Sequence, residues 1–131
     1  MNTSAIRKVL RVTYEQALAR VPEALKSEGF GVLTEIDVQS TLQQKLGIEF
    51  RRYKILGACN PPFANQALQI DLEAGLAMPC NVVVFEDDDR RAVVTAVDPT
   101  RTVAALGNNP KLVELATALK AKLIRALERL E

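Results

Sequence analysis

Two valine-rich runs in the second half of the chain are separated by a short acidic turn. Residues 82–86 read VVVFE, residues 92–97 read AVVTAV, and Asp87-Asp88-Asp89-Arg90 lies in the connection between them. β-Branched residues favour strands, and a connection this short can join two strands only as an antiparallel hairpin. The chain is therefore expected to contain a sheet that is antiparallel at least in part, which excludes an all-helical fold and an all-parallel sheet.

The remaining segments alternate between strand-like and helix-like patterns. Thr13 with Gln16 forms a capping-box pattern that predicts the start of a helix, and Pro22 predicts a kink or a break within it. Asn109-Pro110 predicts the start of a long C-terminal helix. We expect further strands over about 3–12, 31–38 and 50–59, and further helices over 40–46 and from Asn60-Pro61 to Ala74.

This order of elements predicts one domain over residues 1–131, of the α+β class. The predicted architecture is a two-layer α/β sandwich with a mostly antiparallel sheet of about five strands and helices on one face. The residues on the apolar phase of each element predict the core, and these are Leu18, Val21, Leu25, Ile36, Ile55, Val82, Val84, Val93 and Leu119.

Composition excludes several classes of function. The chain has no His, which removes His-based catalytic triads and nearly every zinc enzyme site. It has no Trp and a net charge of only +1, so we expect neither a stacking platform for bases nor binding to nucleic acid or a membrane surface. The N-terminal residues do not form a signal peptide, which predicts a cytoplasmic protein with its cysteines reduced.

Cys59 and Cys80 are the main candidate functional residues. Cys59 directly precedes the predicted helix start at Asn60-Pro61, where helix amides can stabilise a thiolate, and Gly57 is expected to leave a gap beside its sulfur. Burial of both cysteines as small apolar residues is an equally good interpretation. If the connecting helix makes a crossover, the two cysteines lie about 18 Å apart at opposite ends of the sheet; if the helix lies across the sheet, they can meet.

Polar residues near these strands form a second candidate group. Glu35 and Asp37 lie two residues apart on one strand face, a spacing that suits a pair of carboxylates, a metal ion or a plain solvated surface. Lys45 is a candidate activator of the Cys59 thiol. Asn60 is most simply a helix cap, with contact to a ligand as the alternative. The three consecutive aspartates lack the spacing of a calcium loop, so we expect them to form only a polar turn.

Three segments together resemble the family known as domain of unknown function 302. They are GFGVLTEIDV at 29–38, KLGIEFRRYKILGACNP at 45–61 and MPCNVVVFED at 78–87. The resemblance covers nearly the whole chain and implies a two-layer α/β domain with an antiparallel sheet, often found as a dimer. The positions that match include Glu35, Asp37, Lys45, Tyr53, Cys59, Asn60, Pro61, Pro79 and Cys80, whereas Met78 departs from the usual Leu.

Three functions remain open from the sequence. The first is a binding module for a small ligand or a soft metal ion, with Cys59 and with Cys80 or Met78 as ligands, because thiolates and thioethers suit ions such as Cu(I). The second is a thiol-dependent enzyme or sulfur carrier with Cys59 as its nucleophile. The third is a structural interaction module. We also expect a homodimer, because the apolar arc of the C-terminal helix is wider than one packing stripe requires.

Overall fold

A five-stranded antiparallel sheet organises the molecule. The computed structural model describes residues 5–131, and its sheet has the strand order β1-β5-β4-β3-β2 with every neighbouring pair antiparallel. The strands are β1 (Ala5–Leu10), β2 (Gly31–Asp37), β3 (Tyr53–Cys59), β4 (Cys80–Glu86) and β5 (Ala92–Val97). β4 and β5 form the hairpin that the valine-rich runs predict, and the predicted α+β class with a largely antiparallel sheet is confirmed.

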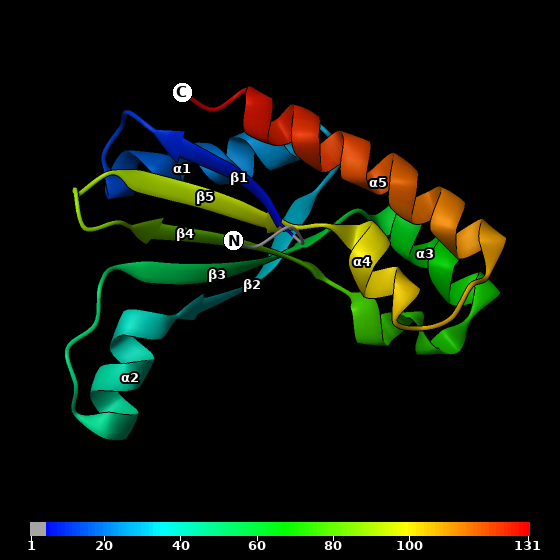
Figure 1. The fold of residues 1–131 in the computed structure, drawn as a ribbon, viewed down its shortest axis with the longest axis horizontal. Coiled ribbons are helices and arrows are strands. Elements are labelled where there is room, and N and C mark those ends of the chain that lie inside the picture. The colour runs from blue at the N-terminus through cyan, green and yellow to red at the C-terminus, as the bar shows by residue number, and fades with distance from the viewer. Residues whose placement is uncertain (1–4) are drawn as a thin grey trace.

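The helices are distributed over one face and both ends of this sheet (Figure 1). α1 (Tyr14–Lys26) and the C-terminal part of α5 (Pro110–Glu128) pack on one face. At one end lie α3 (Pro61–Ile70), the 3-10 helix η1 (Leu72–Ala77) and α4 (Pro99–Ala104). α2 (Val38–Leu46) projects from the other end. No helix among residues 5–131 is both long and apolar enough to cross a membrane.

Local signals account for most helix ends. The Thr13–Gln16 capping box is present, and Gly47 ends α2 in a left-handed conformation. The predicted break at Pro22 is wrong: α1 runs through it, because burial of Val21 and Leu25 on either side offsets the cost of the missing backbone hydrogen bond.

Two helix boundaries near the end of the sheet also differ from expectation. The helix predicted to continue to Ala74 stops at Ile70, where the Asp71 carboxylate accepts a hydrogen bond from the Glu73 amide and starts η1. α4 was not predicted at all. It begins where the Asp98 carboxylate accepts a hydrogen bond from the Thr100 amide at 2.9 Å. Side-chain capping of this kind can start a short helix without any apolar periodicity.

The predicted core residues are at least half-buried on four elements, α1, β4, β5 and α5, and the prediction is wrong on β2 and β3. Most of the nine predicted residues are fully or largely covered: Val21, Leu25, Val82, Val84 and Val93 are buried, and Leu18 and Leu119 are half-buried. Ile36 and Ile55 are not core residues. Ile36 is 50% exposed and Ile55 is only half-buried, whereas Leu56, one residue further along β3, is 3% exposed. The even-numbered side chains of β3 face the helices, so the phase of this strand was assigned wrongly.

Most of the wide apolar arc of α5 packs against other elements of the same chain. Its C-terminal part places Leu123 and Leu127 in the core, while Leu112 and Ala116 are buried where α5 meets α3 and α4. The second packing partner that the sequence indicates for this helix is therefore α3 with α4. Val113 of the same arc remains 44% exposed.

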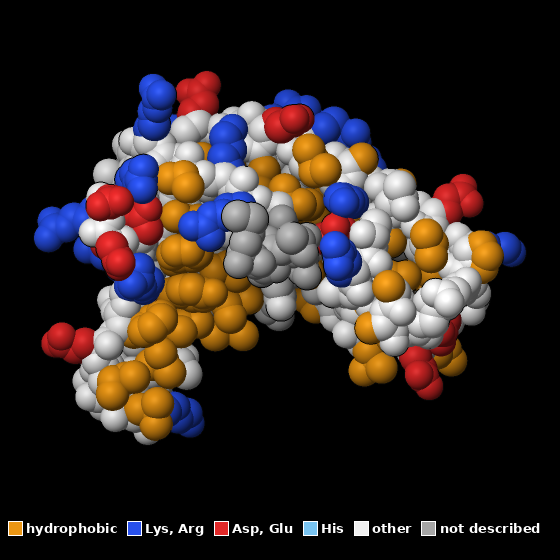
Figure 2. Space-filling view, viewed as in Figure 1, with side chains coloured by type: hydrophobic (Ala, Val, Ile, Leu, Met, Phe, Trp, Pro, Cys, Tyr) orange, Lys and Arg blue, Asp and Glu red, His pale blue; other side chains and the backbone are white. Residues whose placement is uncertain are grey.

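The sheet face opposite α1 and α5 carries apolar and aromatic side chains. No helix within residues 5–131 packs over it. Tyr53 and Phe85 stack with ring centroids 5.4 Å apart, Phe50 lies 6.0 Å from Tyr53, and the Arg7 guanidinium lies over Phe85. Figure 2 shows hydrophobic side chains gathered along this side of the molecule and onto α2. We call this area the open face.

A buried carboxylate joins α5 to the turn before β2. Glu28 is paired with Arg125 at 3.0 Å and with Arg129 at 3.3 Å. Burial by itself raises the pKa of Glu28, but the hydrogen bonds and charges of the two arginines outweigh burial and hold that pKa below its usual 4.5. The ionised form therefore stabilises the fold at neutral pH.

We expect this contribution to disappear on acidification. A carboxyl whose pKa is lower in the folded state stabilises the protein above its unfolded pKa, and this stabilisation is lost as the pH falls through the folded value. Urea unfolding at a series of pH values from neutral to 3 should show a steeper loss of stability for the wild type than for Glu28→Gln. Glu114→Gln, at an exposed position of α5, is the control and should follow the wild type. Parallel curves for the wild type and Glu28→Gln would contradict this role.

Candidate functional site

The antiparallel pairing of β3 with β4 brings the two cysteines to the same end of the sheet. Cys59 is the last residue of β3, Cys80 is the first of β4, and Ala58 lies directly opposite Cys80. The crossover that would place the cysteines at opposite ends is therefore absent between these strands. α3 and η1 instead carry the chain back to its starting end, so that the two residues become diagonal neighbours. Both are free thiols.

A cavity of about 60 Å³ lies beside the two cysteines, where α3, η1, α4 and α5 meet the strand ends. This is several times the ~10–15 Å³ that one water molecule requires. Its walls are almost entirely apolar, and they consist of Ala58, Cys59, Asn60, Phe63, Ala64, Ala67, Ala74, Ala77, Met78, Pro79, Cys80, Pro99, Val103, Leu112, Leu115, Ala116 and Leu119. The two thiols are the only titratable groups in this set. We call this space the thiol cavity.

The two thiols differ in their access to solvent. Cys80 is 5% exposed, and burial raises its pKa to about 11, with a smaller contribution from the neighbouring Cys59. Cys80 is therefore a neutral thiol at pH 7. Cys59 is only partly buried. Of the two cysteines, Cys59 is therefore the more accessible to solvent.

Asn60 connects the cavity wall to the turn that precedes β2. It is buried, and its Nδ2 donates a hydrogen bond to the Glu28 carbonyl at 3.1 Å. Asn60 does occupy the N-cap position of α3, as the sequence predicts, but its side chain makes no capping hydrogen bond. The hydrogen bond from its amide connects the start of α3 to the turn before β2, and it holds the adjacent Cys59 in position.

Two local arguments for a reactive Cys59 do not hold. Pro61 and Pro62 occupy the first two positions of α3, and neither has an N–H with which to stabilise a thiolate. Gly57 leaves no gap, because Thr34 and Pro79 fill the space beside it. Any difference in reactivity between the cysteines must come from exposure rather than from the helix terminus.

We expect Cys59 to be alkylated faster than Cys80 in the folded protein. The Cys80→Ser variant retains only Cys59 and should react with iodoacetamide at least tenfold faster at pH 8 than Cys59→Ser, which retains the covered thiol with the raised pKa. In denaturant the two variants should react at equal rates, which would show that the difference in the folded state comes from the structure around each thiol. Equal rates in the folded state would show that the cavity opens to both thiols alike.

Three of the candidate polar residues lie at the other end of the sheet. Glu35 forms an ion pair with Lys54 at 2.8 Å, and Asp37 is the N-cap of α2, where it accepts a hydrogen bond from the Ser40 amide. Lys45 is exposed on α2. Lys54 precedes Cys59 by five strand positions, about 17 Å. The structure therefore separates Glu35, Asp37 and Lys45 from the thiol cavity, and Lys45 cannot activate Cys59.

Comparison with known proteins agrees with the family resemblance seen in the sequence. The model of the family described as "Domain of unknown function DUF302" matches residues 6–130. The chain belongs to the DUF302 family. A crystal structure of an uncharacterized conserved DUF302 protein from Bacillus stearothermophilus is 30% identical in sequence and has a TM-score of 0.91, over 99% of this chain and 100% of that one. Comparison with curated proteins finds no match.

Sequence patterns did not reveal most of the cavity wall in this DUF302 chain. The wall depends on small residues of α3 and η1, namely Ala64, Ala67, Ala74 and Ala77, and on residues of the unexpected helix α4. The spacing of these alanines was the available signal, since small side chains at helical intervals leave space where larger ones would fill it. That signal is weak, because alanine is also simply a good helix former.

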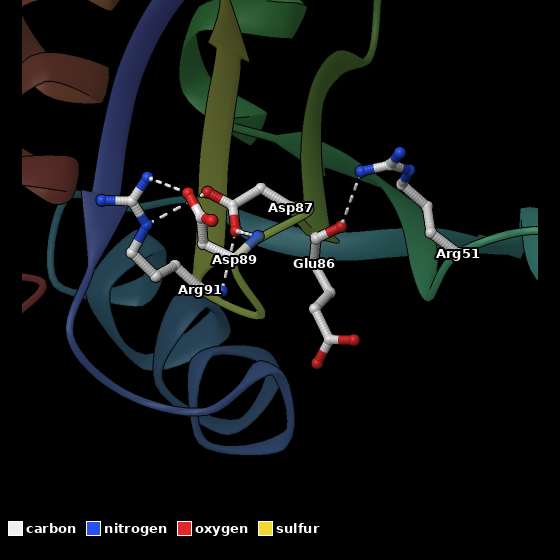
Figure 3. A network of polar contacts seen from close by, with 5 residues as sticks. All are labelled: Arg51, Glu86, Asp87, Asp89 and Arg91. Carbon is white, nitrogen blue, oxygen red and sulfur yellow. Dashed lines mark hydrogen bonds and ion pairs between the residues drawn. The ribbon is translucent and has the colours of Figure 1, made fainter.

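The acidic hairpin turn forms a polar network of its own (Figure 3). Asp87 Oδ1 accepts hydrogen bonds from the amides of Asp89 and Arg91, and the Arg91 guanidinium contacts both aspartates. Arg51 donates to the Glu86 carbonyl at 3.1 Å. The hydrogen bond from the Arg91 amide contributes most to holding the pKa of Asp87 below its usual range, against the opposing effect of burial. The predicted polar turn is present, and its carboxylates are engaged in closing it.

Proposed function

We propose that this DUF302 protein is a small-ligand binding module and that the thiol cavity is its binding site. The observation that carries the proposal is the apolar cavity bordered by Cys59 and Cys80 at the junction of four helices with the sheet. Binding sites for small molecules are characteristically concave and mostly apolar, with few polar groups that orient the ligand. Here the orienting groups are the two sulfurs.

The wall chemistry indicates the kind of molecule that fits. Alanine, leucine and proline side chains offer no partner to a charged ligand, so the interior can hold a charge only where a cysteine pairs with it directly. The Asn60 amide is already bonded to the Glu28 carbonyl, so it adds little polarity. The ligand is a compact apolar group or a polarisable atom that contacts sulfur.

The lack of a base or a cation in the cavity wall favours binding over catalysis. A nucleophilic thiol needs a base or a cation to form its thiolate. No described residue of the cavity wall provides one, and Lys45 and Glu35 lie at the far end of the sheet. Cys80 remains protonated at neutral pH. A thiol-dependent enzyme or sulfur carrier would require a group that these walls lack.

Xenon is a suitable probe, because it enters apolar protein cavities and is smaller than benzene, which is documented in a cavity of about 150 Å³. A titration followed by two-dimensional NMR should give saturable shifts at the amides of Ala64, Ala67 and Ala116. Ala67→Leu fills part of the cavity and should weaken the binding at least fivefold. Ala121→Leu places the same substitution on the exposed side of α5 and should leave the affinity unchanged. Shifts that do not saturate, or that lie away from the cavity, would overturn the proposal.

A second proposal concerns self-association through the open face and α2. α2 has nine residues and none of them is buried, yet isolated helices this short are unstable in water. Leu46, Ile48 and Phe50 are exposed at and just after its C-terminal end, and Ile36 is exposed on the adjacent strand. Contiguous exposed apolar surface marks an interaction site.

We propose a second copy of this chain as the partner. Homodimer interfaces are the more apolar class, and Lys45 is the one charged residue of α2 itself. A two-fold axis would place the α2 of each chain against the open face of the other, so that both helices are covered by one self-complementary contact.

Light scattering at micromolar concentration should therefore give twice the 14.4 kDa chain mass. Ile48→Glu should reduce the mass to that of one chain, because it places a charge in the proposed contact. Val113→Glu is the matched control on α5 and should remain dimeric; Val113 is as exposed as Ile48, at 44% each. A wild-type mass of 14.4 kDa, or a dimer that Ile48→Glu does not affect, would exclude this interface.

A further inference from the structure

Three sulfur-containing residues line the thiol cavity. Cys59 ends β3, Cys80 begins β4, and Met78 precedes Cys80 by two residues in the segment that follows η1. Thiolates and thioethers are soft ligands, which select ions such as Cu(I) over hard cations. No group of three or more His, Cys, Asp or Glu residues able to hold a metal occurs within residues 5–131. Among the described residues of the cavity wall, the side chains suited to a soft metal ion are those of Cys59, Cys80 and Met78.

The register of the strands places the two cysteines within reach of one ion. Ala58 lies opposite Cys80, so Cys59 is its diagonal neighbour, with about 6 Å between the Cα atoms for normal strand spacing. A regular strand would direct Cys59 and Ala58 to opposite faces. The cavity, however, lies beyond the ends of both strands, and both cysteines border it. Two metal–sulfur bonds of ~2.3 Å, the length found in zinc thiolates, can span such a pair.

The surroundings favour an ion of low charge and low coordination number. Zinc in structural sites takes four ligands, and the described cavity wall offers three sulfurs and no carboxylate. Calcium and magnesium require oxygen ligands. A monovalent soft ion is satisfied by two thiolates and a weaker thioether, and the apolar wall limits access of water to it.

We propose that Cys59, Cys80 and Met78 bind one Cu(I) ion in the thiol cavity. This inference rests on the proposed function, since it names a ligand for the same cavity. The two thiols lose their protons to solvent as two copper–sulfur bonds form, so Cu+ and two neutral thiols give a bis-thiolate complex of net charge −1 and two protons. Nothing is oxidised or reduced. The Met78 sulfur adds a neutral third contact.

The test is an anaerobic titration of the reduced protein with Cu(I) in competition with a coloured Cu(I) chelator. We expect one ion per chain and a thiolate-to-copper absorption band in the ultraviolet. Cys59→Ser and Cys80→Ser should each weaken binding at least 100-fold and remove most of the band. Met78→Leu conserves volume and both thiols, and should weaken binding by about tenfold. Circular dichroism of each variant establishes that it is folded.

Several results would overturn the inference. They are stoichiometry below one half in the wild type, Cu(I) affinity unchanged in either Cys→Ser variant, or Zn²⁺ binding more tightly than Cu(I) in parallel titrations. The xenon titration separates this inference from the proposal on which it rests. Saturable xenon binding without Cu(I) binding rejects the metal and retains the ligand cavity, whereas failure of both rejects the cavity as a site.

Discussion

Leu56→Ala should lower the free energy of unfolding by about 2–5 kcal/mol, the range for truncation of a fully buried leucine. Leu56 is 3% exposed and lies in the core between the sheet and the helices. Ile55 points to the open face and is only half-buried. Ile55→Ala should therefore cost less than half as much. Urea unfolding of both variants at the same protein concentration measures the difference.

The comparison of Leu56 with Ile55 tests the phase of β3 directly. Both substitutions remove a branched four-carbon side chain from adjacent positions of one strand, so that strand propensity and chain connectivity are matched. Equal losses of stability would show that the open face is as well covered as the core. If a second copy covers Ile55, the loss of stability caused by Ile55→Ala should grow as protein concentration rises. The loss caused by Leu56→Ala should not depend on concentration, because that variant and the wild type gain the same stability from dimer formation.

Gly57→Ala should be the most costly addition of a single methyl group among the glycines of the sheet. A Cβ at Gly57 would lie 2.1 Å from Thr34 Oγ1 and 2.9 Å from Pro79 Cγ, both far inside normal contact. Thr34 is β-branched with a stiff χ1, and the proline ring cannot move aside. Overpacking of this kind costs about 1–3 kcal/mol.

Gly31→Ala is the matched control, because a Cβ at Gly31 in the paired strand meets nothing within 4 Å. This variant should be as stable as the wild type or slightly more stable. Thr34→Ala should recover part of the loss at Gly57, since the Thr34 Cβ lies at an acceptable 3.5 Å, while the contact with Pro79 remains. A double-mutant cycle measured by urea unfolding should show this coupling, and additive effects would contradict it.

The sequence identified candidate site residues but did not show which of them lie together in the fold. The sequence indicated Cys59, with Cys80 or Met78, as candidate soft ligands. It also grouped Glu35, Asp37 and Lys45 with them as candidates, because strand and helix assignments do not show which ends of the strands coincide. The pairing of Ala58 with Cys80 spans a connection that holds two helical segments. Only the return of the chain through α3 and η1 decides that the cysteines meet and that Lys45 does not join them.

Interactions within a few residues determined what the sequence could reveal by itself. The Thr13–Gln16 box, the Asn109-Pro110 helix start, the left-handed Gly47 and the acidic hairpin all depend on neighbours no more than four residues apart. These signals suffice for the order of elements, and the β4–β5 hairpin then requires antiparallel strands. The fold class follows from them.

Tertiary structure alone decided which face of each strand is buried and where space remains. β3 carries apolar residues on both faces, with Ile55 on one and Leu56 on the other, so its alternation cannot identify the core side. Contact with α1 and α5 makes that choice, because those helices cover only one face of the sheet. The thiol cavity is likewise a product of packing: it exists where small side chains of α3 and η1 meet α4, α5 and the strand ends, segments up to about 60 residues apart in the chain.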